Sequence, residues 1–423
     1  MAGPEKKKQV VVIGAGFAGL QAAKVLGRKA PELAVTVLDR RNYHLFQPLL
    51  YQVAMAGLSP AEIATPIRSL LSEHENVRVL LGEVKRVDLE KKEVTGDFGT
   101  MRFDYLLAAT GAQHSYFGHE DWEEHAPGLK TLEQATEIRR RVLTAFELAE
   151  REEDPEKQKA YLTFVVVGGG PTGVEIAGAL GEISRFTLGH DFRRIDPRRT
   201  RVVLIEAGSR VLAAFSEEAS ARALRDLEKL GVSVWTGTRV TSVTAEGVSM
   251  GKEAVRAATV IWAAGVRPSA INASFGTELD RAGRVVVGAD LSLPGHPEVF
   301  VCGDQASFTE GDNPLPGLAP VAMQEGRHAA HNIMRLANGE KTEPFRYKDK
   351  GIMATIGRSQ AVVQYGKLRL YGFTAWLAWL LVHIYYLIGF KNRVFVLAQW
   401  IWAYITFGRA ARLIVHKNWK LDS

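Results

Sequence analysis

The chain is poor in cysteine, with a single one, Cys302, among its 423 residues. One cysteine cannot form an intrachain disulfide, and no Cys-x-x-Cys pair exists for dithiol redox chemistry. We interpret Cys302 as a small apolar residue buried in a strand, and we expect no metal site. Residues 1–8 contain no apolar segment, so we expect no secretory signal and a location on the cytoplasmic side.

Acidic residues are nearly absent from the C-terminal part of the chain. Residues 367–423 hold eight lysines and arginines and one acid, Asp422, which gives them a net charge of +7 against +6 for the whole chain. The rest of the chain is therefore almost neutral. This distribution argues against a nucleic-acid-binding patch on the globular part, and it predicts that the tail lies against anionic lipid.

Two glycine-rich loops occur 154 residues apart, each between an apolar, valine-rich run and a helical pattern. Such a loop needs one glycine for the tight turn, one for close approach of a pyrophosphate, and one for packing of helix against strand. The two sets are Gly14, Gly16 and Gly19, and Gly168, Gly170 and Gly173. Either loop alone would also fit a simple turn, but together they predict two bound nucleotides.

An acidic residue ends the next apolar run after each loop. Asp39 lies 20 residues after Gly19, which is the expected distance for a carboxylate that binds ribose hydroxyls. Glu206 lies 33 residues after Gly173, and we interpret the polar stretch 184–200 as a surface excursion. A carboxylate at Glu206 favours NADH over NADPH, a preference that the nearby Arg201 and Arg210 would soften. The pair of sites indicates a flavoprotein that takes electrons from a nicotinamide.

A second repeated pattern supports a duplicated α/β fold with two Rossmann-like domains. The apolar run ending at Gly111 is matched by the run that ends at Gly265. We expect a first domain over 1–112 and 284–345, a bridge and second domain over 113–283, and a C-terminal region over 346–423. The bridge contains a charged helix from Leu132 to Glu153. A strand ends in Gly303-Asp304, where the aspartate suits the ribityl chain of a flavin or, alternatively, the cap of the following helix.

These motifs resemble the flavoprotein disulfide reductase superfamily, whose fold is glutathione-reductase-like. Two further segments and the tail narrow the resemblance to the type II NADH:quinone oxidoreductases, which are single-subunit enzymes that do not pump protons. The segments run from Asn42 to Ala54 and from Leu318 to Gly326, so the similarity covers nearly the whole chain. It implies an enzyme that oxidises NADH through FAD and reduces a membrane quinone, menaquinone or ubiquinone.

The resemblance also implies roles for individual residues. FAD would be held by Gly14, Gly16, Gly19, Asp39, Thr110, Gly111 and Asp304, and NADH by Gly168, Gly170, Gly173 and Glu206. Glu175 matches a family glutamate near the nicotinamide and flavin, and Gln324 a glutamine of the quinone-site motif. That motif often begins Ala-Gln, where this chain has Ala319-Pro320, so one quinone contact departs from the family pattern. Glu175 either relays a proton or orients backbone at the start of its helix.

The tail carries two apolar runs flanked by basic residues. The first, 372–390, is just long enough to span a bilayer, whereas the second, 394–407, is too short. Five of the eight tryptophans lie in the tail, at 376, 379, 400, 402 and 419, and tryptophan favours the headgroup boundary. We expect two helices lying in the interface of the cell membrane rather than a true span. A buried dimerisation helix is the alternative, and the family implies a homodimer.

The cysteine content and the tail also bear on the alternative functions. Disulfide and sulfide:quinone reductases use reactive cysteines that this chain lacks, and ferredoxin or rubredoxin reductases would not need the tail. An NADH-dependent flavoprotein reductase with another acceptor, or a redox sensor that recruits a partner, is the alternative function.

Overall fold

The computed structural model describes residues 7–189, 191–311, 313–406, 408–409 and 411–415, which form two compact units. Unit 1 comprises Met1–Leu45, Ala64–Gln113 and Val266–Lys350, and unit 2 comprises Phe46–Ile63, His114–Gly265 and Gly351–Ser423. The chain thus changes unit near residues 45, 63, 113, 265 and 350. The domain limits expected at 112, 283 and 345 stay a prediction.

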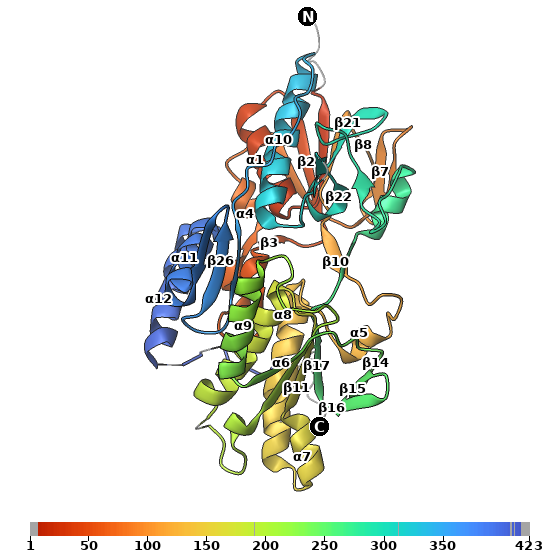
Figure 1. Cartoon of the computed structure of the whole chain (residues 1–423). Coiled ribbons are helices and arrows are strands. Elements are labelled where there is room, and N and C mark those ends of the chain that lie inside the picture. The colour runs from red at the N-terminus through yellow and green to blue at the C-terminus, as the bar shows by residue number, and fades with distance from the viewer. Residues whose placement is uncertain (1–6, 190, 312, 407, 410, 416–423) are drawn as a thin grey trace, which may run out of the picture. The chain divides into compact units, whose positions relative to one another are not determined.

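Unit 1 is built on a six-stranded sheet in the order β20-β21-β9-β1-β2-β5. Its central strand β1 (Gln9–Ile13) runs parallel to β2 (Ala34–Asp39) and β9 (Tyr105–Ala108), and Val10 to Ile13 are buried on both faces. Continuous apolar runs of this kind are typical of parallel sheets covered on both sides. Helices α1 (Phe17–Lys29) and α10 (Ala319–Ala337) pack side by side (Figure 1), because Gly326 brings its backbone close to Ala18.

The remaining elements of unit 1 include β5, β20 and β21, which are the other strands of this sheet. The remaining elements are β3 (Tyr43–Leu45), β4 (Ala64–Pro66), α4 (Ile67–Leu71), β5 (Val77–Leu81), β6 (Val84–Asp88), β7 (Glu93–Gly96), β8 (Gly99–Arg102), β18 (Val266–Pro268), β19 (Val285–Val286), β20 (Ser292–Leu293), β21 (His296–Val301), β22 (Ala306–Ser307), β23 (Thr309–Glu310) and β24 (Asn313–Pro314), with 3₁₀ turns at Ala270–Phe275 and Gly303–Gln305. Strand β10 (Ala112–His114) carries the chain from unit 1 to unit 2.

Unit 2 repeats the arrangement with a four-stranded parallel sheet in the order β13-β12-β11-β17. Strand β11 (Thr163–Val167) is buried throughout and leads into α8 (Pro171–Glu182). The other elements up to residue 265 are a 3₁₀ turn at Gln47–Leu49, α2 (Leu50–Ala54), α3 (Pro60–Ile63), α5 (Trp122–His125), α6 (Leu132–Arg151), α7 (Pro155–Tyr161), a π-helical turn at Ile183–Thr187, a 3₁₀ turn at Pro197–Arg199, β12 (Arg201–Ile205), α9 (Glu217–Lys229), β13 (Val232–Trp235), β14 (Ser242–Thr244), β15 (Gly247–Met250), β16 (Glu253–Arg256) and β17 (Thr259–Trp262). The predicted α/β class with two Rossmann-like sheets is confirmed.

The last part of unit 2 consists of three antiparallel strands followed by two helices. The strands are β25 (Ile352–Thr355), β26 (Ala361–Tyr365) and β27 (Leu368–Tyr371), and the helices are α11 (Gly372–Tyr386) and α12 (Phe390–Thr406). Helix α11 lies beside β26 (Figure 1), and α12 contacts α11. The two expected tail helices are therefore present. Among the described residues, no helix has the length and apolarity needed to cross a bilayer. Phe407, Lys417, Trp419 and Lys420 of the tail lie outside the described residues.

Candidate functional site

The first glycine of each loop makes the turn out of the central strand. Gly14 and Gly168 adopt positive φ angles of 89° and 109°, which side chains rarely tolerate. Their N–H groups donate to the carbonyls of Leu38 and Ile205 at 2.7 and 2.8 Å, so both loops join the adjacent strand in the same way. A Cβ on Gly14 would lie 2.3 Å from the carbonyl oxygen of Ala109. The two turns therefore exclude any larger residue.

The second and third glycines are required for different reasons. A Cβ on Gly19 or Gly173 would lie 1.8 Å from the carbonyl oxygen of the first glycine, so helix and loop pack too closely for a side chain. Gly16 and Gly170 have ordinary φ angles of −69° and −70°, and a Cβ there would meet no heavy atom within 4 Å. Neither backbone conformation nor packing explains these two glycines. Open space at the start of a helix is what a pyrophosphate needs.

The acid after each loop binds the loop directly. Asp39 accepts hydrogen bonds from the N–H groups of Ala15 and Arg41, both at 2.7 Å. Glu206 accepts from Gly169 at 2.5 Å and from Gly208 at 2.6 Å. Burial raises the pKa of Asp39, an effect that these N–H groups oppose. Each carboxylate thus lies at the edge of its open loop, where lone pairs not used by the backbone can accept hydrogen bonds from ribose hydroxyls.

In unit 1, a buried polar chain connects the turn at Thr110 to the turn at Asp304. The side-chain oxygen of Gln305 accepts from both the N–H and the hydroxyl of Thr110 at 2.8 Å, and its nitrogen donates to Asn272 at 2.7 Å. Asp304 lies in the Gly303–Gln305 turn, and the next helix, α10, begins only at Ala319. The alternative that Asp304 caps the following helix is therefore wrong.

The buried side chain of Glu325 binds the backbone of the Cys302-Gly303-Asp304 turn. Its carboxylate is 2% exposed and accepts from the N–H of Gly303 at 2.5 Å. Burial, together with the nearby charge of Asp304, raises the pKa of Glu325 to about 7. Cys302 follows β21 directly and is fully buried, and burial raises the pKa of its thiol well above the usual range. A buried neutral thiol is not a nucleophile, so the interpretation of Cys302 as a packing residue holds.

Gln324 has a backbone role in this structure. Its side-chain nitrogen donates to the carbonyls of Lys348 at 3.0 Å and Pro320 at 3.2 Å, and its oxygen accepts from the N–H of Lys348 at 3.1 Å. Pro320 lies in the first turn of α10, where the missing N–H would have no helical partner. Gln324 belongs to unit 1 and Glu175 to unit 2. The quinone contact assigned to Gln324 stays a prediction.

Glu175 lines a pocket within unit 2, together with Gln47, Leu50, Tyr51, Leu129, Lys130 and Thr172. It is the fifth residue of α8, beyond the first turn, and its carboxyl group accepts a hydrogen bond from the N–H of Thr355. The alternative that it orients the helix start is therefore wrong. Burial raises the pKa of Glu175 to about 8, although the Thr355 N–H opposes this shift. The side chain is thus a neutral acid at neutral pH that holds a transferable proton.

Tyr51 also lines this pocket, and Trp400 of α12 orients the neighbouring side chain of Gln52. The indole N–H of Trp400 can only donate, and it donates to the side-chain oxygen of Gln52 at 2.7 Å. The nitrogen of Gln52 then faces Tyr51 and donates to its hydroxyl at 3.0 Å. The phenolic hydrogen of Tyr51 is not used in this chain of bonds.

Comparisons with known proteins agree with this geometry. The family model for pyridine nucleotide-disulphide oxidoreductases matches residues 8–326. Type II NADH:quinone oxidoreductase NdhA of Mycobacterium tuberculosis is 44% identical, over 93% of this chain and 86% of the relative. The chain belongs to the type II NADH:quinone oxidoreductases. The enzyme of this name from Staphylococcus haemolyticus is 31% identical, over 86% of this chain and 91% of the relative.

A solved structure extends the similarity to the fold. NDH2 from Plasmodium falciparum in complex with NADH has a TM-score of 0.86 and 19% sequence identity, and the match covers 97% of this chain and all of that one. At this identity the likeness concerns the fold alone. Because this match covers 97% of the chain, the shared fold extends beyond residue 326, where the match to the family model ends.

Four buried polar residues of this type II chain were missed from sequence: Asn272, Gln305, Glu325 and His44. The last is 2% exposed, and its Nδ1 lies 2.9 Å from the carbonyl oxygen of Ala15 in the first glycine loop. Burial lowers the pKa of His44 to about 4, so the ring is neutral. For two of the four the sequence offered a signal, because Gln305 follows Asp304 and Glu325 follows Gln324, and both Asp304 and Gln324 are motif residues.

Gly170→Ala is expected to weaken NADH binding without destabilising the fold. The new methyl group enters open space that only the pyrophosphate would occupy, so the KM for NADH should rise at least about tenfold, or about 1.4 kcal/mol. The midpoint of thermal unfolding should stay within a few degrees of the parent value. Gly173→Ala is the matched control, because its methyl group overlaps the carbonyl oxygen of Gly168 and should destabilise unit 2. An unchanged KM in Gly170→Ala would contradict the assignment.

Glu175→Gln is expected to make stability less dependent on pH. The carboxyl pKa is 4.5 unperturbed and about 8 in the fold, so between these values the folded state binds the extra proton. Stability conferred by the neutral acid is therefore lost as pH rises through this window. Near pH 4.5 the variant should have the same free energy of unfolding as the parent. At pH 9 its free energy of unfolding should be higher than the parent's by about a few kcal/mol. Urea unfolding measures this, with the exposed Glu246→Gln as control; a difference that is constant with pH would refute it.

Proposed function

We propose that this protein oxidises NADH through a bound FAD and passes two electrons to a membrane quinone without pumping protons. Membership of the type II family supports the reaction class. The observation that carries the proposal is the repeated glycine loop, with open space at Gly16 and Gly170 and an acid at each edge. The single buried cysteine argues against electron transfer through a redox-active disulfide within the chain.

FAD is assigned to unit 1, since its site fits the group. The Gly14–Gly19 loop leaves room for a pyrophosphate, Asp39 accepts from ribose hydroxyls, and Asp304 suits a ribityl chain. Gln305 fixes the Thr110 turn, which also places Gly111. When bound, FAD supplies the redox chemistry, taking a hydride from the nicotinamide and returning two electrons to the quinone.

NADH is assigned to unit 2. The pyrophosphate would lie at Gly170 on the N-terminus of α8, where unpaired N–H groups and the helix dipole favour negative charge. Glu206 would bind the adenine ribose. Thr172 and Glu175 lie on the same helix and line the pocket described above, so one helix serves both the nucleotide and the proton-carrying group.

Glu175 is the proposed proton-transfer residue. Reduction of a quinone to a quinol takes up two protons, and a carboxyl group with a pKa of about 8 is protonated at neutral pH yet able to release its proton. Tyr51 lines the same pocket. Gln324 is the predicted contact to the quinone, which would require it to release the backbone of Lys348.

The tail is proposed to hold the protein on the cytoplasmic face of the membrane as a peripheral protein. Helices α11 and α12 expose large apolar side chains to solvent, among them Tyr385 at 70% and Phe390 at 82%. Lys391, at the start of α12, would meet anionic lipid. Arg409 and Arg412 are paired within unit 2, with Glu182 and Asp191, so they are less suited to that role. A homodimer is expected from the family resemblance.

The test is stopped-flow absorbance on the full-length protein in detergent or liposomes. NADH should bleach the flavin rapidly, and a menaquinone or ubiquinone analogue should then restore its absorbance rapidly. Bleaching without recovery by any quinone would overturn the quinone assignment and favour another acceptor or a redox sensor. Absence of bleaching would overturn NADH as the donor.

Glu175→Gln is expected to slow the quinone step more than the NADH step. Glutamine keeps the shape of the side chain but carries no acidic proton, so flavin reoxidation should fall about a hundredfold while flavin reduction changes little. Single-turnover rates of the two half-reactions measure this. Equal effects on both rates would rule out a proton-transfer role.

A further inference from the structure

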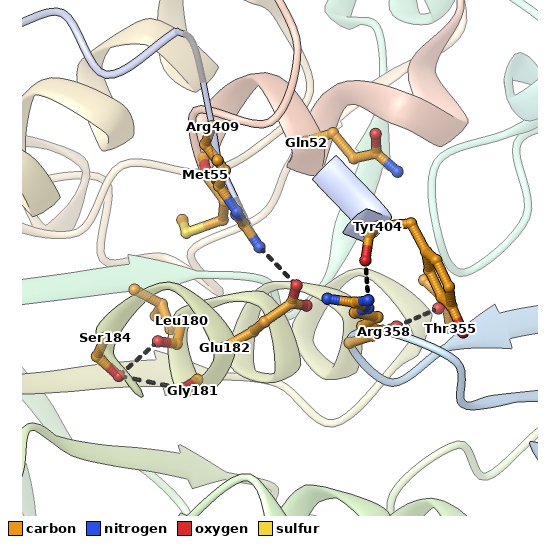
Figure 2. A network of polar contacts seen from close by, with 12 residues as sticks. Gln52, Met55, Leu180, Gly181, Glu182, Ser184, Thr355, Arg358, Tyr404 and Arg409 are labelled. Carbon is orange, nitrogen blue, oxygen red and sulfur yellow. Dashed lines mark hydrogen bonds and ion pairs between the residues drawn. The ribbon is translucent and has the colours of Figure 1, made fainter. Parts of the chain in front are cut away.

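Arg409 lies in the segment after α12, yet its side chain is largely withdrawn from water. Its guanidinium donates to the carbonyl oxygen of Met55 at 2.7 Å and lies 3.5 Å from the carboxylate of Glu182. The exposed fractions of the two charged side chains are 11% and 17%. Figure 2 shows Arg409 directed at Glu182 with Met55 beside it. A pair with so little exposure differs from a surface salt bridge, which contributes little to the free energy of unfolding.

The two partners of Arg409 lie next to the end of α2 and at the last residue of α8. Met55 follows Ala54, the last residue of α2, and the next residue, Ala56, has a positive φ of 56°, so the chain turns sharply there. Glu182 is the last residue of α8 and leads directly into the π-helical turn Ile183–Thr187. An arginine can serve both partners because its planar group carries several N–H donors in a fixed arrangement. Arg409 therefore ties the C-terminal end of α2 to that of α8.

These two helices carry the proton-bearing groups of the pocket. Tyr51 is on α2, and Glu175 is on α8 two turns before Glu182. The charges of Glu182 and Arg409 both act on the phenol of Tyr51, in opposite directions, which indicates how near the ion pair lies. The tail also contacts α2 through the Trp400 to Gln52 bond. Two separate contacts from the C-terminal region thus fix α2.

We propose that Arg409 is a positioning residue, which holds α2 against α8 so that Tyr51 and Glu175 keep their spacing around the pocket. The proposal rests on the proposed function for its kinetic test, since it assigns Arg409 to the step that uses Glu175. Arg369 of β27 provides a contrast in the same unit: its partner is Glu218 of α9, and their exposed fractions are 48% and 65%. That pair lies outside the pocket and joins neither α2 nor α8.

The kinetic test compares Arg409→Gln, Arg409→Lys and the control Arg369→Gln in the full-length, flavin-loaded protein. Arg409→Gln should slow flavin reoxidation by quinone about tenfold and leave flavin content unchanged, because small misplacements of reacting groups are costly. Arg409→Lys should recover part of the rate, since lysine restores the positive charge without the planar set of N–H donors. Arg369→Gln should match the parent, because it removes only an exposed ion pair. In a Glu175→Gln background, Arg409→Gln should add nothing, because the group it positions is already absent.

An activity-independent test follows the titration of Glu175. The groups that face or adjoin its pocket are Tyr51, Lys130, Glu182 and Arg409. Loosening α2 admits water and weakens the burial that raises the pKa of Glu175. The extra stability of Glu175→Gln at pH 9 relative to pH 5 should therefore shrink when Arg409 is replaced by Gln and be unchanged with Arg369→Gln.

The outcomes separate the two proposals. If the parent protein fails to reduce any quinone, the proposed function falls, while the titration test still reports on Arg409. Arg409 acts only as a structural residue if Arg409→Gln lowers the unfolding midpoint but leaves both the quinone step and the Glu175 titration unchanged, and that result overturns the inference. Additive effects of Arg409→Gln and Glu175→Gln on the quinone step would overturn it as well.

Discussion

The structure depends on the absence of a side chain at two turns. At Gly14 and Gly168 the chain leaves a central parallel strand with a positive φ and passes against the end of the neighbouring strand. A Cβ at either position would overlap backbone atoms. Because the turns are this tight, the next residues place their N–H groups at the edge of the sheet, where Asp39 and Glu206 accept from them. One steric constraint, used twice, thus creates both proposed nucleotide sites.

The second constraint is the burial of the carboxyl group of Glu175. Glu175 receives a single N–H bond from Thr355, which is too little to offset the loss of water, so its pKa rises to about 8. The α8 backbone packs closely against the segment after β25, since a Cβ on Gly178 would lie 2.9 Å from the N atom of Gly357. This close packing keeps water from the acid and favours its neutral form. The remaining wall, α2, packs against α6 and is also bound by side chains from the tail.

The sequence predicted what local spacing determines. The strand, loop and helix around each glycine set, the acids Asp39 and Glu206, the charged helix at residue 132 and the two tail helices all follow from short-range patterns. It did not predict the partners that come from distant segments. Thr110 is bound by Gln305, 195 residues away, and Gln52 by Trp400, 348 residues away. Two alternatives were wrong: that Glu175 orients the start of its helix, and that Asp304 caps the following helix. Both applied a general preference for acids at helix starts without knowing which residue caps each helix.

The geometry at Glu206 bears on the choice between NADH and NADPH. Both carboxylate oxygens already accept backbone N–H groups, from Gly169 and Gly208, so the negative charge is held firmly in place. A ribose 2′-hydroxyl can donate to such a group, whereas a 2′-phosphate is repelled by it. The two arginines expected to soften this preference have other partners. Arg210 donates to the carbonyls of Phe215 and Ala213 and to the hydroxyl of Ser220, and Arg201 lies over the ring of Trp235. Recruiting either to a phosphate would break existing contacts, so the loop geometry favours NADH.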